Sequence, residues 1–268
     1  MTVEDKIYRK AKETISNFGE KPTKDVGAIL NIVQSFELSE NSVMDAVHSI
    51  YIRLCQEIKN VDAKQAHQSW VSSSGGSFEN IVRNFINESL NSEGILAVKG
   101  DNLRKNGKTK DIVEFLTLKA SRRCTQTNTG VWPDSDIVVL TKEKNGKLKA
   151  FALLNCKTSD HSRNDAVLFW ALALRDNNIK YCLVTSDLDY KFKKGDYDKQ
   201  ISGFRRKCEA YLDRVYTTNP ITEECSQIRK LDFWKPQGAQ SFLSELRIWR
   251  KEVVPDFINQ PIDENALL

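Results

Sequence analysis

The sequence has no long hydrophobic run. No apolar stretch approaches the roughly 20 residues that a membrane-spanning helix needs, and residues 1–6 lack the apolar core of a signal peptide. The sequence also has no internal repeats and no low-complexity tracts. These absences argue against a helical membrane protein and a repeat architecture, and we expect a cytoplasmic protein.

Residues that bind zinc are few and scattered. The chain has six cysteines and three histidines, and no two cysteines form a CxxC pair, so a zinc site is not expected. A disulfide framework is not expected in a cytoplasmic protein either. Cys156 and Cys182 lie within apolar runs, and we interpret them as small buried thiols. There is no GxxxxGK[ST] loop, so the chain itself should not hydrolyse a nucleotide.

The composition is that of an ordinary globular protein. Hydrophobic residues make up 40% and charged residues 28% of 268 residues, which allows one large domain or a core with an added subdomain. The net charge of +4 is only mildly basic, but the basic residues are clustered. Such clusters can neutralise DNA phosphates or can be solvated surface. They are Arg104, Lys105, Lys108 and Lys110; Arg122 and Arg123; Lys191, Lys193 and Lys194; and Arg205, Arg206 and Lys207.

The first quarter of the chain has the apolar periodicity of helices. We expect helices over Val3–Phe18, Lys24–Phe36 and Ser42–Ile58, which together make residues 1–68 a helical subdomain for dimerisation or DNA recognition. Residues 69–77 are rich in serine and glycine and predict a flexible connector. Residues 69–268 are then the second domain, with its core at about 78–187.

The middle of the chain alternates helices and strands. We expect an amphipathic helix over Phe78–Leu90, a short strand at 94–99 and a basic loop over Lys99–Lys110. The pattern of Asp111–Ala120 is ambiguous but favours a helix. We expect a hairpin of Ser135–Leu140 and Lys149–Asn155, turning at Asn145-Gly146, followed by a helix over Ala166–Arg175 and a buried strand over Tyr181–Thr185. A helix between two strands favours a parallel crossover.

The predicted fold is therefore α/β, with a mixed sheet, helices on both faces and a helical N-terminal subdomain. Beyond Asp187 we expect mainly helix, with candidates over Lys199–Tyr216 and Gln240–Glu252. The tail after Pro255 is expected to be loosely ordered.

Polar residues that could take part in catalysis lie at one end of the predicted hairpin. Pro133-Asp134 stands before its first strand, and Asn155-Cys156-Lys157 ends its second strand, with 20 residues between Asp134 and Asn155. A hairpin brings these ends together at one edge of a sheet. A carboxylate that holds a divalent metal beside a lysine suits phosphodiester cleavage.

This arrangement resembles the PD-(D/E)xK nucleases, and Thr158-Ser159 after the lysine makes it similar to type II restriction endonucleases in particular. The resemblance covers about Phe78 to Asp187. It implies a restriction-endonuclease-like core and Mg²⁺-dependent cleavage of double-stranded DNA at a specific sequence, leaving 5′-phosphate and 3′-hydroxyl ends. It also implies a homodimer, which matches a palindromic duplex, and a companion methyltransferase.

The resemblance assigns roles to individual residues. Asp134 matches the metal-binding aspartate, with Asp136 as the competing ligand, since both would point to the same face of a strand. Lys157 matches the lysine that orients the attacking water or offsets charge on the phosphate. Glu79 matches the acid of the first core helix, although an exposed ion pair with Arg83 is its alternative. Asp134 and Lys157 could instead be a turn residue and a surface lysine.

Asn155 departs from the pattern, because related motifs have Asp or Glu at this place. An amide oxygen can bind Mg²⁺ but brings no charge, so either another acid compensates or the metal binds weakly. Asp165 and Asp160 are the candidates in the next segment, and Asp165 could instead be a residue favoured by the helix dipole. If neither of them compensates, Glu79 becomes the second negatively charged ligand beside Asp134.

Arginines and lysines near the motif are candidates for DNA contact, because arginine presents a bidentate fork to guanine or phosphate. They are Arg122, Arg123, Arg163 and Lys105. Three other functions stay open: a repair, nicking or homing nuclease on the same core; a DNA-binding protein with a decayed nuclease site; and an α/β interaction protein whose basic clusters are solvated.

Overall fold

A computed structural model describes most of the chain. The described residues are 2–15, 17–36, 43–105, 107–118, 130–158, 164–193, 202–235, 237–265 and 267. The candidate residues Arg122, Arg123, Asp160 and Arg163 lie outside them.

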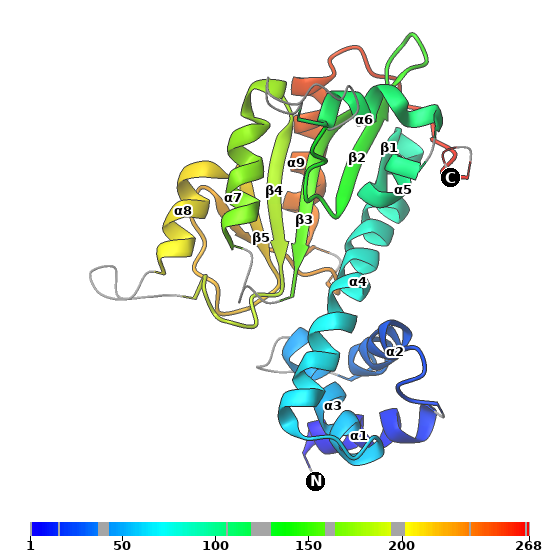
Figure 1. Cartoon of the computed structure of the whole chain (residues 1–268), viewed down its shortest axis with the longest axis vertical. Helices are drawn as coiled ribbons and strands as arrows, with labels where there is room; N and C mark the ends of the chain where they lie inside the picture. Colours follow the sequence, from blue (N-terminus) through cyan, green and yellow to red (C-terminus); the bar gives the residue numbers. More distant parts are fainter. Residues whose placement is uncertain are drawn as a thin grey trace.

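Four helices open the chain (Figure 1). They are α1 (Val3–Thr14), α2 (Pro22–Gln34), α3 (Val43–Ile58) and α4 (Ala63–Leu90). Thr2 and Asp5 form a capping box at the start of α1, and Asp62 caps α4. We call α1, α2, α3 and the first turns of α4 the helical unit; it lies at the bottom of Figure 1, below the sheet.

The prediction of a flexible connector over residues 69–77 is wrong, because these residues form the middle of α4. Trp70 and Phe78 are buried on either side of the serine-rich stretch. The hydroxyl of Ser73 donates to the carbonyl oxygen of Ser69 at 2.6 Å, and that of Ser77 donates to the carbonyl oxygen of Ser73 at 3.2 Å. Packing outweighs the weak helix propensity of serine and glycine here. The predicted boundary at residue 68 therefore falls inside a helix.

The predicted mixed sheet is confirmed, and it has six strands in the order β1-β2-β3-β4-β5-β6. They are β1 (Ile95–Lys99), β2 (Ile137–Lys142), β3 (Leu148–Lys157), β4 (Lys180–Thr185), β5 (Arg214–Thr217) and β6 (Ile228–Lys230). The first two pairs are antiparallel and the other three are parallel. The expected hairpin is β2–β3, with Gly146 at φ +85 in its turn, and the expected parallel crossover joins β3 to β4.

The C-terminal third differs from its predicted helices. The helix expected over Lys199–Tyr216 is confined to α8 (Gly203–Tyr211), and the residues after it form β5 and β6. These strands have only four and three residues, too few for an alternating pattern to be recognised. The helix expected over Gln240–Glu252 is confirmed as α9 (Gln240–Val253).

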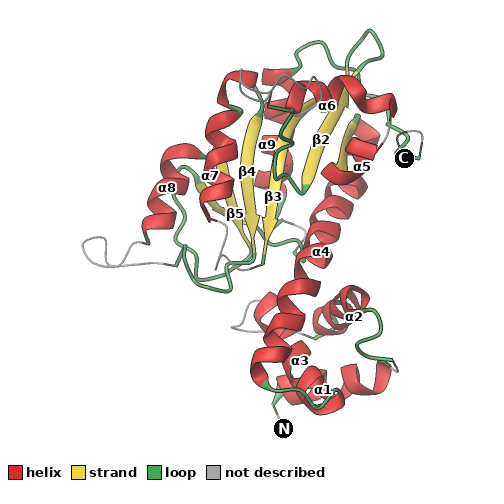
Figure 2. Ribbon diagram, in the orientation of Figure 1, coloured by secondary structure: helices red, strands yellow, loops and turns green. Residues whose placement is uncertain are grey.

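Helices cover both faces of the sheet (Figure 2). Alternate residues of a strand point to opposite faces. One face packs on α4 and α9 and shares a single core cluster with the helical unit. The other packs on α5 (Gly100–Lys105), α6 (Lys110–Leu116), α7 (Asn164–Ala173) and α8. Single 3₁₀ turns occur at η1 (Asn91–Glu93), η2 (Gly107–Thr109) and η3 (Arg175–Asn177). The loop expected over Lys99–Lys110 thus contains α5 and η2.

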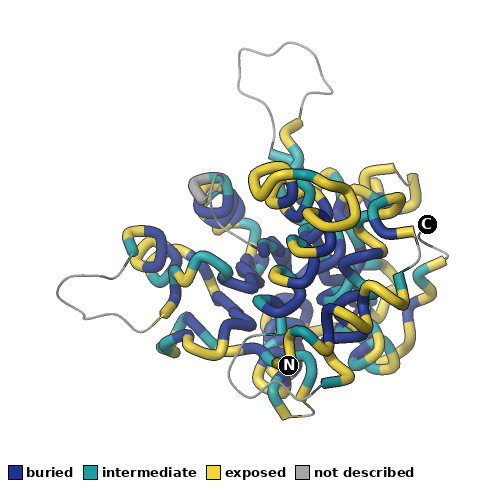
Figure 3. Tube along the Cα trace, turned by 90° about the horizontal axis from the view of Figure 1, so that it is seen from below, coloured by how far each residue is buried: buried dark blue, intermediate teal, exposed yellow. Residues whose placement is uncertain are grey.

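Burial follows these layers. Figure 3 shows buried backbone in the interior and exposed backbone on the outer turns and loops. Cys156 and Cys182 are buried free thiols, as expected. The tail was expected to be loosely ordered, but Ile258 donates its N–H to the carbonyl oxygen of Lys142 at 2.9 Å and Ile262 is buried, so the described part of the tail packs on the core. No helix in the described residues is long and apolar enough to cross a membrane.

Candidate active site

Three strands bring their ends together at the lower edge of the sheet in Figure 1. Lys99 ends β1 and pairs with Ile137 at the start of β2, and Ile137 pairs with Leu154 near the end of β3. This register places Lys99, Asp136 and Lys157 at one edge, which faces the helical unit. The hairpin predicted from the sequence therefore does bring a carboxylate and a lysine together.

Asp136 is the carboxylate that contacts the lysine. Its Oδ2 accepts a hydrogen bond from the backbone N–H of Cys156 at 2.6 Å and lies 3.4 Å from Nζ of Lys157. Burial raises the pKa of the Asp136 carboxyl, and the charge of Lys157 and the Cys156 N–H only partly oppose this. The sequence favoured Asp134 as the metal ligand, with Asp136 as the competitor; of the two, Asp136 is the one whose carboxylate pairs with Lys157.

Glu79 reaches the same space from α4. Its Oε2 lies 3.5 Å from Nζ of Lys99, so the ion pair with Arg83 expected as the alternative is not formed; Arg83 pairs with Glu264 at 3.2 Å. Burial raises the pKa of Glu79, and the negative charge of Asp136 raises it further. The two carboxyl groups are thus close enough to repel each other.

The hydrogen bonds that hold Asp134 to the described residues are made by its backbone carbonyl oxygen and not by its carboxylate. Its carbonyl oxygen accepts hydrogen bonds from Nδ2 of Asn155 at 2.6 Å and from the hydroxyl of Tyr181 at 3.2 Å. Burial and the charges of Asp134 and Asp136 raise the pKa of Tyr181, so this hydroxyl stays protonated and remains a donor.

A cavity of about 550 Å³ opens beside these groups. Its lining includes Glu79, Asp134 and Asp136 together with three residues that the sequence did not single out as site residues, Lys99, Arg104 and Pro133. Trp132, which the structure places in the same lining, lies 5.9 Å from the Arg104 guanidinium. Lys99 could have been found by the signal that identified Lys157, because each lysine ends a predicted strand.

The remaining predicted residues lie behind the cluster, outside the cavity lining, or are only partly described. Asn155 is fully buried, and its Oδ1 has no hydrogen-bond partner among the described residues. Lys105 is exposed at the end of α5. Asp165 lies in the first turn of α7, whose backbone alone is described there.

The donor set fits a hard divalent cation. The carboxylate residues Glu79, Asp134 and Asp136 line one cavity, and Mg²⁺ in proteins uses one or two carboxylates and completes its shell with waters and substrate phosphates. The described residues contain no group of three or more His, Cys, Asp or Glu side chains placed to hold a metal without such help. Burial is the main cause that raises the pKa of both Asp136 and Glu79, because it disfavours their ionised forms. A divalent cation would stabilise those ionised forms.

Residues 108–237, just under half of the chain, match the family model described as BsaWI restriction endonuclease type 2. The matched segment contains Asp134, Asp136, Asn155 and Lys157, and Glu79 lies before it. No curated protein matches the chain.

Three solved structures are similar to the chain over most of both lengths. The restriction endonuclease AgeI in a specific complex with DNA is 15% identical, with a TM-score of 0.61 over 91% of this chain and 92% of that one. BsaWI in a pre-specific complex with DNA is 16% identical, with a TM-score of 0.44 over 94% and 93%. PspGI with substrate DNA is 13% identical, with a TM-score of 0.39 over 93% of each. The AgeI likeness shows that the fold is that of a restriction endonuclease.

Proposed function

We propose that the chain is a type II restriction endonuclease and that Mg²⁺-dependent cleavage of double-stranded DNA takes place at the cluster of Asp136, Asp134, Glu79 and Lys157. The match of residues 108–237 to the family model and the fold support this proposal. The observation that carries this proposal is the 3.4 Å pair of Lys157 and Asp136 at the β2–β3 edge. This pair lies inside the segment that matches the family.

The residues divide the chemistry between them. Asp136 and Glu79 would hold the cation, with Asp134 as a further ligand from the same cavity. When bound, Mg²⁺ would lower the pKa of a coordinated water and offset charge on the phosphate. The ammonium of Lys157 would orient the attacking water or stabilise the charge that develops on the phosphate. The Cys156 N–H fixes the Asp136 carboxylate so that it faces this lysine.

The reaction would be an in-line hydrolysis. The water oxygen forms a bond to phosphorus while the bond from phosphorus to the 3′ oxygen breaks, and the leaving oxygen takes a proton. The products are a 5′-phosphate and a 3′-hydroxyl. Lys105 and the arginines Arg122, Arg123 and Arg163 are proposed DNA contacts, and Asp165 is proposed as a supplementary acid.

The assembly follows from the substrate. A homodimer would place two such sites on the two strands of a palindromic duplex. In the cytoplasm of its cell the enzyme would act beside a companion methyltransferase that protects host DNA.

Digestion of a long, unmethylated DNA tests this proposal. Wild type, Lys157→Ala and Asp136→Asn are each incubated with Mg²⁺ and with EDTA. Lys149→Ala is the matched control, because Lys149 lies on the same strand, paired with Glu143 at 3.6 Å, away from the cluster. Discrete fragments from wild type and the control with Mg²⁺ alone, and at least about a 100-fold loss in both site variants, support the proposal. DNA that is bound but intact under all conditions would indicate a decayed site.

A further inference from the structure

One backbone atom beside the candidate site receives two buried side-chain donors. The carbonyl oxygen of Asp134 accepts from Nδ2 of Asn155 on β3 at 2.6 Å and from the hydroxyl of Tyr181 on β4 at 3.2 Å. Asn155 is 0% exposed and Tyr181 is 2% exposed. Two buried donors on one carbonyl oxygen fix the direction of that peptide group.

We propose that Asn155 and Tyr181 act as positioning residues, a two-donor clamp that fixes the Asp134 peptide and thereby the Asp136 carboxylate against Lys157. This inference rests on the proposed function for its cleavage assay only. It assigns Asn155 to the backbone of the acidic segment rather than to the metal, and it adds Tyr181, which no sequence pattern indicated.

The chemistry of the acceptor explains why an amide is found at position 155. A carbonyl oxygen can accept but cannot donate, so its partner must carry an N–H or O–H. A carboxylate at position 155 would place an acceptor against an acceptor where both groups are buried, and an unpaired buried charge is costly. The departure from the acid of related motifs is therefore required by the clamp.

Other hydrogen bonds and close packing also hold residues 133–136, in addition to the clamp. Gly100 donates its N–H to the carbonyl oxygen of Asp136 at 3.1 Å, and Ser135 donates to the carbonyl oxygen of Pro133 at 2.8 Å. A Cβ at Gly100 would lie 2.5 Å from the carbonyl oxygen of Ser135, so the segment is packed closely against the start of α5. From the side of β3 and β4, Asn155 and Tyr181 hold the Asp134 carbonyl group, and the Cys156 N–H and Lys157 hold the Asp136 carboxylate.

The clamp acts on catalysis through distance. Asp136 follows the clamped peptide by two residues and makes its 2.6 Å bond to the Cys156 N–H and its 3.4 Å pair with Lys157. A displacement of about 1 Å in a reacting group can lower a rate by about 100-fold. Loss of the clamp should thus reduce the rate of cleavage at saturating Mg²⁺ while DNA affinity is kept.

The test compares Asn155→Asp and Tyr181→Phe with two matched controls. Asn219→Asp changes another buried asparagine whose Nδ2 donates to a backbone carbonyl oxygen, that of Asp187, at 3.0 Å. Tyr216→Phe removes the hydroxyl of another buried tyrosine, on β5, which donates to the carboxylate of Glu245 on α9. Measurements are the single-turnover cleavage rate, the Mg²⁺ concentration for half-maximal rate, DNA affinity, and hydrogen exchange of the Cys156 amide.

We expect Asn155→Asp to lose about 100-fold in the rate at saturating Mg²⁺ and Tyr181→Phe to lose about tenfold, with DNA affinity unchanged. Both should speed exchange of the Cys156 amide, and neither control should do so. Cleavage by Asn155→Asp at the wild-type rate, with a lower Mg²⁺ requirement, would overturn the proposal, because position 155 would then be a ligand. Equal losses in the controls would overturn it too. If wild type does not cleave DNA, the proposed function fails, and the exchange of Cys156 still decides whether the clamp exists.

Discussion

At the residue scale, the carboxyl groups of Asp136 and Glu79 govern how the site responds to pH. Both have raised pKa values, mainly because they are buried, and both must be ionised to hold a cation. A raised pKa means that each group takes up a proton at a higher pH than an exposed carboxyl does. We therefore expect the single-turnover rate to fall on acidification before ordinary carboxylates titrate, by up to about tenfold per pH unit for each group.

The comparison variant for this pH prediction is Glu79→Gln, which removes one of the two titrating groups. Its remaining activity should show a shallower acid limb than wild type, and added Mg²⁺ should move the wild-type limb to lower pH because the cation competes with the proton. A rate that stays constant with pH down to the titration range of exposed carboxyls would contradict the assignment of these two residues.

The choice between Asp134 and Asp136 shows what a sequence leaves open at this scale. Both precede the same strand, so spacing alone cannot separate them. The sheet register sets Asp136 beside the end of β3, where the Cys156 N–H and Lys157 meet its carboxylate, and for this reason we propose Asp136 as a ligand. The roles of Asn155 and Tyr181 were equally hidden, since both depend on the position of a backbone carbonyl.

At the element scale, α4 and the start of α5 predict opposite effects for the same substitution. Gly75 lies in mid-helix with no atom within 4 Å of a built Cβ, so Gly75→Ala should stabilise the protein by about 1 kcal/mol. Gly100→Ala would place a Cβ 2.5 Å from the carbonyl oxygen of Ser135 and should destabilise by roughly 1–3 kcal/mol. Chemical denaturation of both variants measures the two free energies, and changes of the same sign would contradict the packing described at Gly100.

Element boundaries could be predicted where the apolar period is long and distinct. The β2–β3 hairpin and α9 follow such patterns, and they were found at nearly their observed bounds. The serine and glycine stretch of α4 was misread because its helix depends on tertiary burial of Trp70 and Phe78. The strands β5 and β6 form because neighbouring elements bury them, and their own sequences carry no distinct strand pattern.

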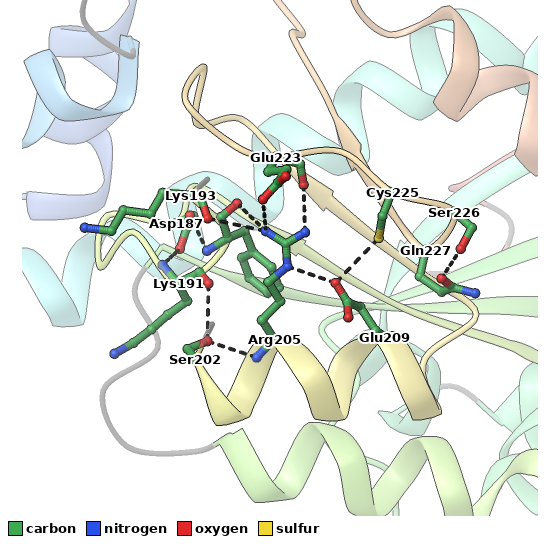
Figure 4. Close-up of polar contacts among 11 residues, drawn as sticks. Asp187, Lys191, Lys193, Ser202, Arg205, Glu209, Glu223, Cys225, Ser226 and Gln227 are labelled. Atoms are coloured by element: carbon green, nitrogen blue, oxygen red, sulfur yellow. Dashed lines mark hydrogen bonds and ion pairs between the residues drawn. The ribbon is translucent and has the colours of Figure 1, made fainter. Parts of the chain in front are cut away.

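Arg205 joins α8 to two loops, as Figure 4 shows. Its guanidinium, 1% exposed, pairs with Glu209 at 2.8 Å and donates to the carbonyl oxygens of Phe192 at 3.1 Å and Glu223 at 3.2 Å. Removing it leaves the partly buried carboxylates of Glu209 and Glu223 without their cation, and the carbonyl oxygen of Glu223 without this donor. We expect Arg205→Met to lower the free energy of unfolding by about 3–5 kcal/mol.

The neighbouring exposed residue supplies the control for this element. Arg206→Met changes the same side-chain type one position along α8, where the side chain faces solvent, and should stay within about 0.5 kcal/mol of wild type. Urea titrations of the two variants measure the difference. Similar stability for both would mean that the Arg205 network does not hold the loops.

At the scale of the whole molecule, the helical unit and the sheet with its covering helices share one interior. A single cluster of buried side chains runs from Ile7 in α1 through Trp70 and Phe78 in α4 to Val254 after α9. Ser74 of α4 also bonds to Thr158, the residue after Lys157, at 2.9 Å in a buried contact. The two parts are therefore coupled by a continuous helix, by a continuous core and by a hydrogen bond beside the candidate site.

This coupling predicts one cooperative unfolding transition for the whole chain. Truncation at residue 62 would expose the buried faces of Ala66 and Trp70 on α4, so the remainder should aggregate or lose stability by several kcal/mol rather than fold as an independent domain. Tryptophan fluorescence reports on the five tryptophans together, among them Trp70 in α4 and Trp249 in α9, and far-ultraviolet circular dichroism reports on all helices. Coincident denaturation curves from both probes support a single unit. A shared core cannot be divided without exposing it. Two separated transitions, or a truncated chain that cleaves DNA at the wild-type rate, would therefore contradict the shared core and mean that the helical unit folds independently.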